Sequence, residues 1–244
     1  MKQIFNKKSH EKFIKYFNIK PLSSVIEKNF YGKTNKYLKF IKWIPGLRMI
    51  WVWNSISMNC ASKDSDIDLF IVTTPNSIWL NRIIITFIFS ILWVRKNPKK
   101  HAGRFCLSFF ATTDWLDFSS WKIEDDIYLY FWIIYFKPII DYNNTYDLFI
   151  EKNSSWADFS EYSNIIENNK NFIPQPLTPS LVRRGDNWDN FIINFINKLL
   201  KKIFLPKTLK HYNKIWKPYW VIINDNMLKF HNGDVRKKTK KDLV

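Results

Sequence analysis

Glycine and cysteine are both scarce in this sequence. The 244 residues contain 5 glycines, too few for a fold built on glycine-rich turns, and neither a GxGxxG nor a Walker-type phosphate loop occurs. The 2 cysteines, Cys60 and Cys106, form no CxxC pair, so a disulfide scaffold is excluded and we interpret both as reduced, mostly buried thiols. The N-terminus lacks the apolar segment of a secretory signal, which predicts a cytoplasmic protein.

A hydrophobic run long enough to cross a membrane is also lacking. The most apolar segment, residues 79–94, falls short of the ~20 residues needed to span a bilayer, and Asn81 and Arg82 lie near its start. We therefore predict a buried helix packed on a sheet and expect no membrane partner. The alternative is peripheral attachment to a membrane through 83–94 or 188–204.

Positive charge is concentrated at the two ends of the chain, and the formal net charge is +17. Residues 1–50 hold 12 Lys/Arg against 2 Asp/Glu, residues 189–244 hold 13 against 4, and the middle, 51–188, holds 13 against 15. A slightly acidic centre between basic flanks suits a cation site that handles an NTP, RNA or another polyanion. The alternative is that the flanks are only solvated, lysine-rich faces.

The pattern of apolar residues predicts an α+β fold, and the composition, 46 % hydrophobic and 24 % charged, is that of a globular protein. Strand-like runs occur at 48–53, 65–73 and 104–111, and helical patterns at 79–94, 127–136 and 188–204. We divide the chain into a helical N-terminal region (1–45), a core (46–160), a Pro- and Gly-containing linker (161–187) and a basic C-terminal region with a helix and a mobile tail (188–244). We expect a small mixed sheet with helices on one face, closed by the C-terminal region.

Two aspartates open the strand predicted at 65–73. Because side chains alternate across a strand, Asp66 and Asp68 should point to one face, while Ile67 points to the other. Two carboxylates this close repel each other unless a cation lies between them. Mg²⁺ takes one or two protein carboxylates and leaves its other positions to water and phosphate oxygens. The pair therefore predicts a metal site suited to phosphoryl or nucleotidyl transfer.

The residues around this pair follow a familiar order. Asn54-Ser55 comes directly after the first strand, and Asp66 follows Ser55 by 11 residues. A strand, a Gly-Ser turn entering a helix and a strand with Asp-x-Asp form the core of the DNA polymerase β-like nucleotidyltransferase superfamily. The segment 48–73 resembles that core, most closely that of a group of bacterial nucleotidyltransferase-domain proteins.

The resemblance implies a Mg²⁺-dependent nucleotidyltransferase that moves an NMP from an NTP to a hydroxyl acceptor. Asp66 and Asp68 would be its catalytic residues and would bind two Mg²⁺ ions. Asn54, Ser55 and the nearby backbone N–H groups would hold the nucleotide phosphates at a helix N-terminus, and Arg82 would reach a phosphate from the helix after the strand. The alternative for Arg82 is a helix-end arginine that extends its charge to solvent.

Two features depart from the family pattern. Asn54 replaces a glycine that lets a triphosphate approach the backbone. The strand at 104–111 holds no Asp or Glu, and Ser108 stands where active members carry a third carboxylate that accepts the proton of the attacking hydroxyl. Asp114 and Asp117 could substitute for it only if the next loop folds back. The alternative function is a catalytically degraded nucleotidyltransferase fold that binds nucleic acid or another partner.

Overall fold

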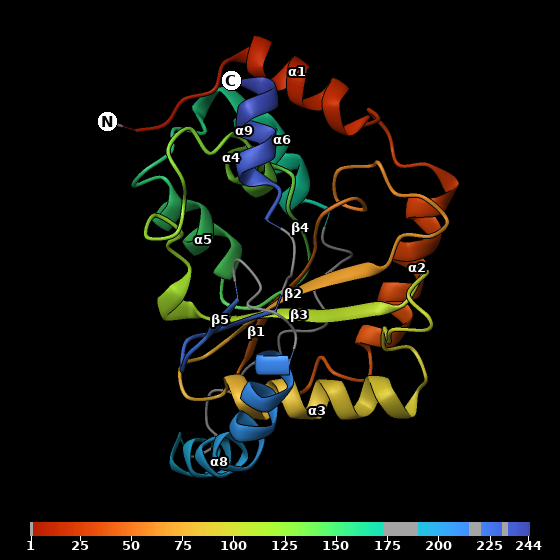
Figure 1. Ribbon diagram of the computed structural model, residues 1–244, viewed down its shortest axis with the longest axis vertical. Helices are drawn as coiled ribbons and strands as arrows, with labels where there is room; N and C mark the ends of the chain where they lie inside the picture. The colour runs from red at the N-terminus through yellow and green to blue at the C-terminus, as the bar shows by residue number, and fades with distance from the viewer. Residues whose placement is uncertain (1, 173–189, 215–220, 231–233) are drawn as a thin grey trace.

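A mixed sheet of six strands forms the centre of the protein (Figure 1). The computed structural model describes residues 2–172, 190–214, 221–230 and 234–244. In the order β4-β1-β2-β3-β6-β5, the strands are β4 (Lys137–Asp141), β1 (Leu47–Val52), β2 (Ile67–Thr73), β3 (Phe105–Thr112), β6 (Met227–Lys229) and β5 (Ile222–Ile223). Neighbours are antiparallel except β2 and β3, which are parallel. The prediction of an α+β fold with a mixed sheet is confirmed.

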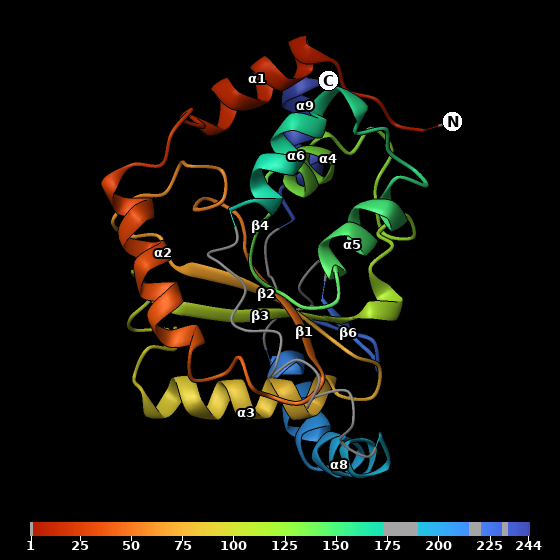
Figure 2. The same ribbon diagram turned by 180° about the vertical axis from the view of Figure 1, so that it is seen from behind.

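Helices cover both faces of this sheet (Figures 1 and 2). On one side lie α3 (Ile78–Ile91) and α8 (Asn190–Lys214), and on the other lie α1 (Lys7–Phe17), α4 (Ile127–Ile134), α5 (Thr145–Asn153), α6 (Ser163–Lys170) and α9 (Arg236–Leu243); α2 (Val25–Leu38) flanks one end. The expectation of helices on one face is wrong. Both alternating sets of side chains in β1 and β2 are apolar, so each face must be covered.

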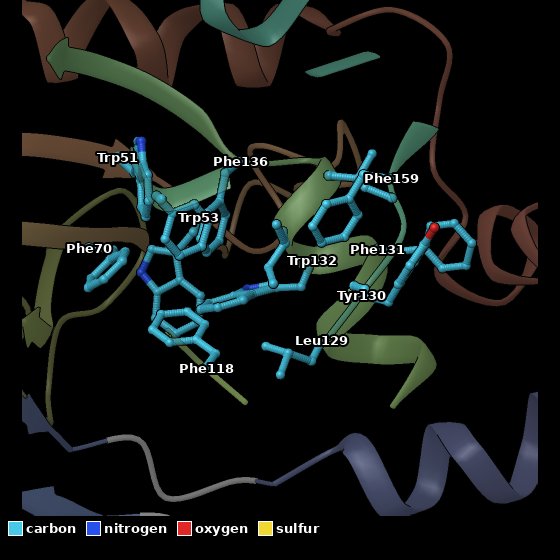
Figure 3. Close-up of a cluster of buried hydrophobic side chains, with 14 of the residues drawn as sticks. Trp51, Trp53, Phe70, Phe118, Leu129, Tyr130, Phe131, Trp132, Phe136 and Phe159 are labelled. Carbon is cyan, nitrogen blue, oxygen red and sulfur yellow. The ribbon is translucent and has the colours of Figure 1, made fainter. Parts of the chain in front are cut away.

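The two faces carry different cores. An aromatic cluster under α4 and α5 includes Trp51, Phe70, Phe118 and Trp132, which are labelled in Figure 3, and also Phe109. Phe70 and Phe109 stack with their ring centroids 4.1 Å apart. The opposite face is largely aliphatic and packs against α2 and α3. Much of the 18 % aromatic content therefore serves to fill one layer of the protein.

The helix predicted at 188–204 is longer than expected. It appears as α8, which continues through Pro206 to Lys214 instead of ending before the proline. The Asn197 side chain is buried against α3, where its Oδ1 accepts hydrogen bonds from the backbone N–H groups of Trp79 and Leu80. This packing helps to fix the helix in place despite the hydrogen bond that a proline removes.

Part of the predicted linker is also ordered. The short 3-10 helix η2 (Ser160–Tyr162) and α6 occupy its first part, and residues 173–187 lie outside the described residues. Within the ranges that the structure describes, the helices are all too short or too polar to cross a membrane.

The C-terminal tail, expected to be mobile, is the helix α9. Its first residue, Arg236, is 5 % exposed and pairs with Asp234 at 2.7 Å and with the fully buried carboxylate of Asp126 at 3.5 Å. Leu243 joins the aromatic core at the other end of the helix. The prediction of a mobile tail is wrong because the sequence is dominated by exposed lysines, whereas the buried side chains of Arg236 and Leu243 attach the helix to the rest of the protein.

Candidate functional site

Asp66 and Asp68 lie at the start of β2, where the structure brings their carboxylates together. Asp66 directly precedes the strand and Asp68 is its second residue. One oxygen of each carboxylate and the Sγ atom of Cys106 all lie within 4.8 Å of one another. This cluster, Asp66–Asp68–Cys106, is the candidate site. It lies under α4, on the face that carries the aromatic core.

Asp68 is the buried member of the cluster, with 7 % exposure. Its Oδ2 accepts a hydrogen bond of 2.9 Å from the side-chain amide of Asn54, whereas its Oδ1 is buried and has no hydrogen-bond partner among the described residues. Burial, together with the negative charge of Asp66, raises the pKa of Asp68 well above the usual range of an aspartate. A buried carboxylate oxygen without a donor is an acceptor position for a cation.

Asn54 does not leave room for a phosphate in the way that a glycine would. Its backbone is left-handed, with φ +59°, and its amide turns toward Asp68. On its other side, the amide oxygen accepts hydrogen bonds from Trp132 Nε1 at 3.1 Å and Tyr128 Oη at 3.4 Å. Both of these residues belong to α4, so the Asn54 amide bridges the helix and the strand that carries Asp68.

Asp66 is the more accessible carboxylate, and it already faces a cation. Lys96 Nζ lies 2.5 Å from Asp66 Oδ2, and the two side chains are 42 % and 21 % exposed. Burial lowers the pKa of Lys96 and the hydrogen bond to Asp66 raises it, with a net upward shift. Lys96 therefore remains charged and places a positive charge at the outer side of the pair.

Cys106, and not Ser108, is the residue of β3 that lies beside the two aspartates. In the parallel pairing of β2 and β3, Cys106 lies opposite Asp68, and a bulge in β3 follows before Phe70 meets Phe109. Ser108 lies within this bulge, and its hydroxyl accepts a 3.3 Å hydrogen bond from the Cys106 thiol. Burial and the Asp68 charge raise the pKa of Cys106, so the thiol stays protonated.

Ser55 lies close to the cluster but not at a helix N-terminus. Residues 54–59 form consecutive turns rather than a helix, with Met58 N–H donating to the Asn54 carbonyl and Cys60 N–H donating to that of Ser55. The expectation that a helix begins at Asn54-Ser55 is therefore wrong. The reason is local, because Met58 is buried in the aromatic core and Ile56 in the aliphatic core on the opposite face.

Arg82 is on the opposite face of the sheet from Asp68. It donates to the Leu107 carbonyl at 3.3 Å, and its guanidinium carbon lies 4.1 Å from the ring centre of Phe230. Burial lowers its pKa to about 10. The structure thus supports neither a phosphate contact at the cluster nor a solvent-directed side chain. Asp114 and Asp117 are exposed beyond the far end of β3 and do not reach the cluster either.

The donors suit a divalent cation. Asp66 and Asp68 are two residues apart, and Asp68 has a buried oxygen without a hydrogen-bond donor among the described residues. Carboxylate oxygens are the ligands that Mg²⁺ and Mn²⁺ prefer. The protonated thiol of Cys106 is a weak ligand for such ions. Comparisons with protein-family models, curated proteins and solved structures each returned no match.

Proposed function

We propose that this protein is a divalent-cation-dependent nucleotidyltransferase that moves an NMP from an NTP to a hydroxyl acceptor. The observation that supports it is the buried, unpartnered Oδ1 of Asp68 beside the accessible carboxylate of Asp66. Asp66 and Asp68 would hold the cation, and Mg²⁺ is the ion that we expect there. When bound, such an ion neutralises phosphate charge and aligns the attacking and leaving oxygens.

The surrounding residues of the chain have separate tasks in this proposal. Asn54 holds Asp68 in its rotamer through the 2.9 Å hydrogen bond. Lys96 offers a positive charge at the accessible side, where the phosphates of an NTP would enter. Among the described residues, no third carboxylate faces the pair, so the acceptor proton passes to solvent or to a substrate oxygen. A missing general base lowers the rate by ~10²–10⁴, so we expect slow turnover.

The test is transfer of label from α-labelled NTPs, with Mg²⁺ or Mn²⁺, to a mixed pool of cellular RNA, proteins and metabolites. The matched variants are Asp68→Asn and Asp64→Asn, the second being an exposed carboxylate nearby in the same loop. We expect label transfer by the wild type and Asp64→Asn, and none by Asp68→Asn. Transfer that persists in both Asp66→Asn and Asp68→Asn would refute the proposal.

A second candidate is a catalytically degraded fold that binds RNA or another polyanion through its basic flanks. The Asn54 amide favours it, because it fills the space beside Asp68 that a glycine would leave open. This function predicts RNA affinity that falls steeply with salt and is equal in the wild type and Asp68→Asn. Filter binding at several salt concentrations tests this affinity, and the label-transfer assay separates the two candidates, since only the enzyme requires Asp68 for transfer.

A further inference from the structure

A cavity lies away from the aspartate pair, where α1, α6 and β4 meet. It measures about 410 Å³, and its polar lining consists of two lysines, Lys20 and Lys137, together with His10, Tyr135 and the asparagines at 59, 168 and 169. Isoleucine and proline side chains form the rest of the wall. None of the described lining residues is Asp or Glu, so the wall offers positive charge and amide groups to a ligand, but no negative charge.

Lys137 is the central group of this cavity. It lies on β4, is 8 % exposed, and has no ion-pair partner in the described part of the chain. Its ammonium donates one hydrogen bond, to Asn59 Oδ1 at 3.0 Å, which leaves donors for another acceptor. The rings of Tyr31 and Phe172 lie 5.7 and 5.5 Å from this ammonium, and the charge of the buried Glu27 acts in its favour. Burial nevertheless lowers the pKa of Lys137, so these groups compensate the buried charge only in part, and a bound anion would offset the remaining cost.

Asn59 fixes the position of that ammonium. Its Oδ1 also accepts a hydrogen bond from Ser23 Oγ at 2.8 Å, and its Nδ2 donates to the Lys20 carbonyl at 3.2 Å. Both acceptor positions of the amide oxygen are thus used within the protein. It ties Lys137 to the segment that carries Lys20, whose own side chain is exposed at the rim. Asn59 therefore fixes the ammonium of Lys137 and the backbone of Lys20 at the same cavity.

The remaining lining limits the class of ligand. His10 Nε2 lies 2.8 Å from Tyr135 Oη, and burial lowers its pKa, so it contributes hydrogen bonding and not charge. The two positive charges of Lys20 and Lys137 match a ligand with two negative charges better than a ligand with a single carboxylate. The isoleucine wall beside them suits an apolar group attached to that dianion.

We propose that this cavity binds a small organic phosphate monoester, with the phosphate at Lys137 and Lys20 and the organic group against the isoleucine wall. The cavity shares no lining residue with the Asp66–Asp68–Cys106 cluster. The proposal therefore does not depend on nucleotidyl transfer.

Isothermal titration calorimetry of the full chain with phenyl phosphate tests the proposal, with inorganic phosphate and benzoate as comparison ligands. We expect phenyl phosphate to bind more tightly than either, because only it offers both a dianion and an apolar group. Lys137→Met should weaken binding at least tenfold, since a hydrogen bond to a charged group is worth a factor of about ten or more. Lys20→Gln should weaken it about threefold or more.

Two control variants place the ligand. Lys28→Gln removes an exposed lysine that does not line the cavity, and Asp68→Asn alters the proposed metal site; both should bind phenyl phosphate as the wild type does. Circular dichroism checks that each variant folds. If Lys137→Met does not fold, Lys20→Gln still tests the proposal, because that lysine is exposed. The absence of saturable binding at millimolar phenyl phosphate, or equal affinity in the wild type and Lys20→Gln, would overturn the proposal.

Discussion

The side chain of Asn54 offers the sharpest test of how the candidate site is held together. Asn54→Gly removes its amide and leaves Asp68 Oδ2 without that donor, which costs ~1.5–3 kcal/mol for a bond to a charged group. It also leaves the buried Nε1 of Trp132 without an acceptor, at ~1–3 kcal/mol. The sum predicts a loss of about 2.5–6 kcal/mol in the free energy of unfolding at neutral to basic pH.

Asn54→Ala is the matched variant. It loses the same hydrogen bonds but must also adopt φ +59°, which costs an L-residue with a Cβ about 1–2 kcal/mol and costs glycine nothing. The alanine variant should therefore be less stable than the glycine variant by that amount. Urea unfolding followed by tryptophan fluorescence measures both values.

The pH dependence of the stability of these variants provides a second test of the Asn54–Asp68 hydrogen bond. Since the pKa of Asp68 is raised, lowering the pH toward 5 neutralises its carboxyl, which then needs the Asn54 donor less. The loss in Asn54→Gly should shrink between pH 8 and pH 5. Losses below about 1 kcal/mol in both variants, or an alanine variant as stable as the glycine variant, would show that the reasoning about this amide is wrong.

Three further predictions concern the proposed metal site, the C-terminal helix and Lys137 in the cavity between α1, α6 and β4. Mn²⁺ or Mg²⁺ at about 100 times its dissociation constant should raise the melting temperature of the wild type by about 5–10 °C, and that of Asp68→Asn hardly at all. Arg236→Gln leaves Asp126 buried and unpaired and should cost about 3–5 kcal/mol by chemical denaturation, whereas Lys238→Gln, on the exposed side of α9, should cost less than about 0.5 kcal/mol. Burial lowers the pKa of Lys137 to about 8, below that of the unfolded chain, so the unfolded state binds more protons between about pH 8 and 10.4. Stability relative to Lys137→Met should therefore rise across that window, by an amount on the order of 3 kcal/mol; a flat difference would contradict the assignment of Lys137 as a buried cation.

Local regularities in the sequence were sufficient for much of the fold. The strands β1, β2 and β3 and the helices α3 and α4 lie within a few residues of their predicted bounds. These elements have strong apolar periodicity, which is a short-range property. The same reasoning placed Asp66 and Asp68 side by side, because alternation along a single strand depends on no other part of the chain.

Long-range contacts decided the rest. The sequence could not show that Cys106 lies opposite Asp68, because that depends on the pairing and the bulge of two strands about 40 residues apart, a separation that no local periodicity records. It could not show that Asn54 donates to Asp68 while Trp132 donates to Asn54. The cavity around Lys137 draws its lining from several separate segments, and only the packing of α1 and α6 against β4 brings them together. The sequence therefore determined which residues can share a face, and the tertiary structure determined which faces meet, because burying apolar surface on both sides of the sheet fixes contacts between distant segments.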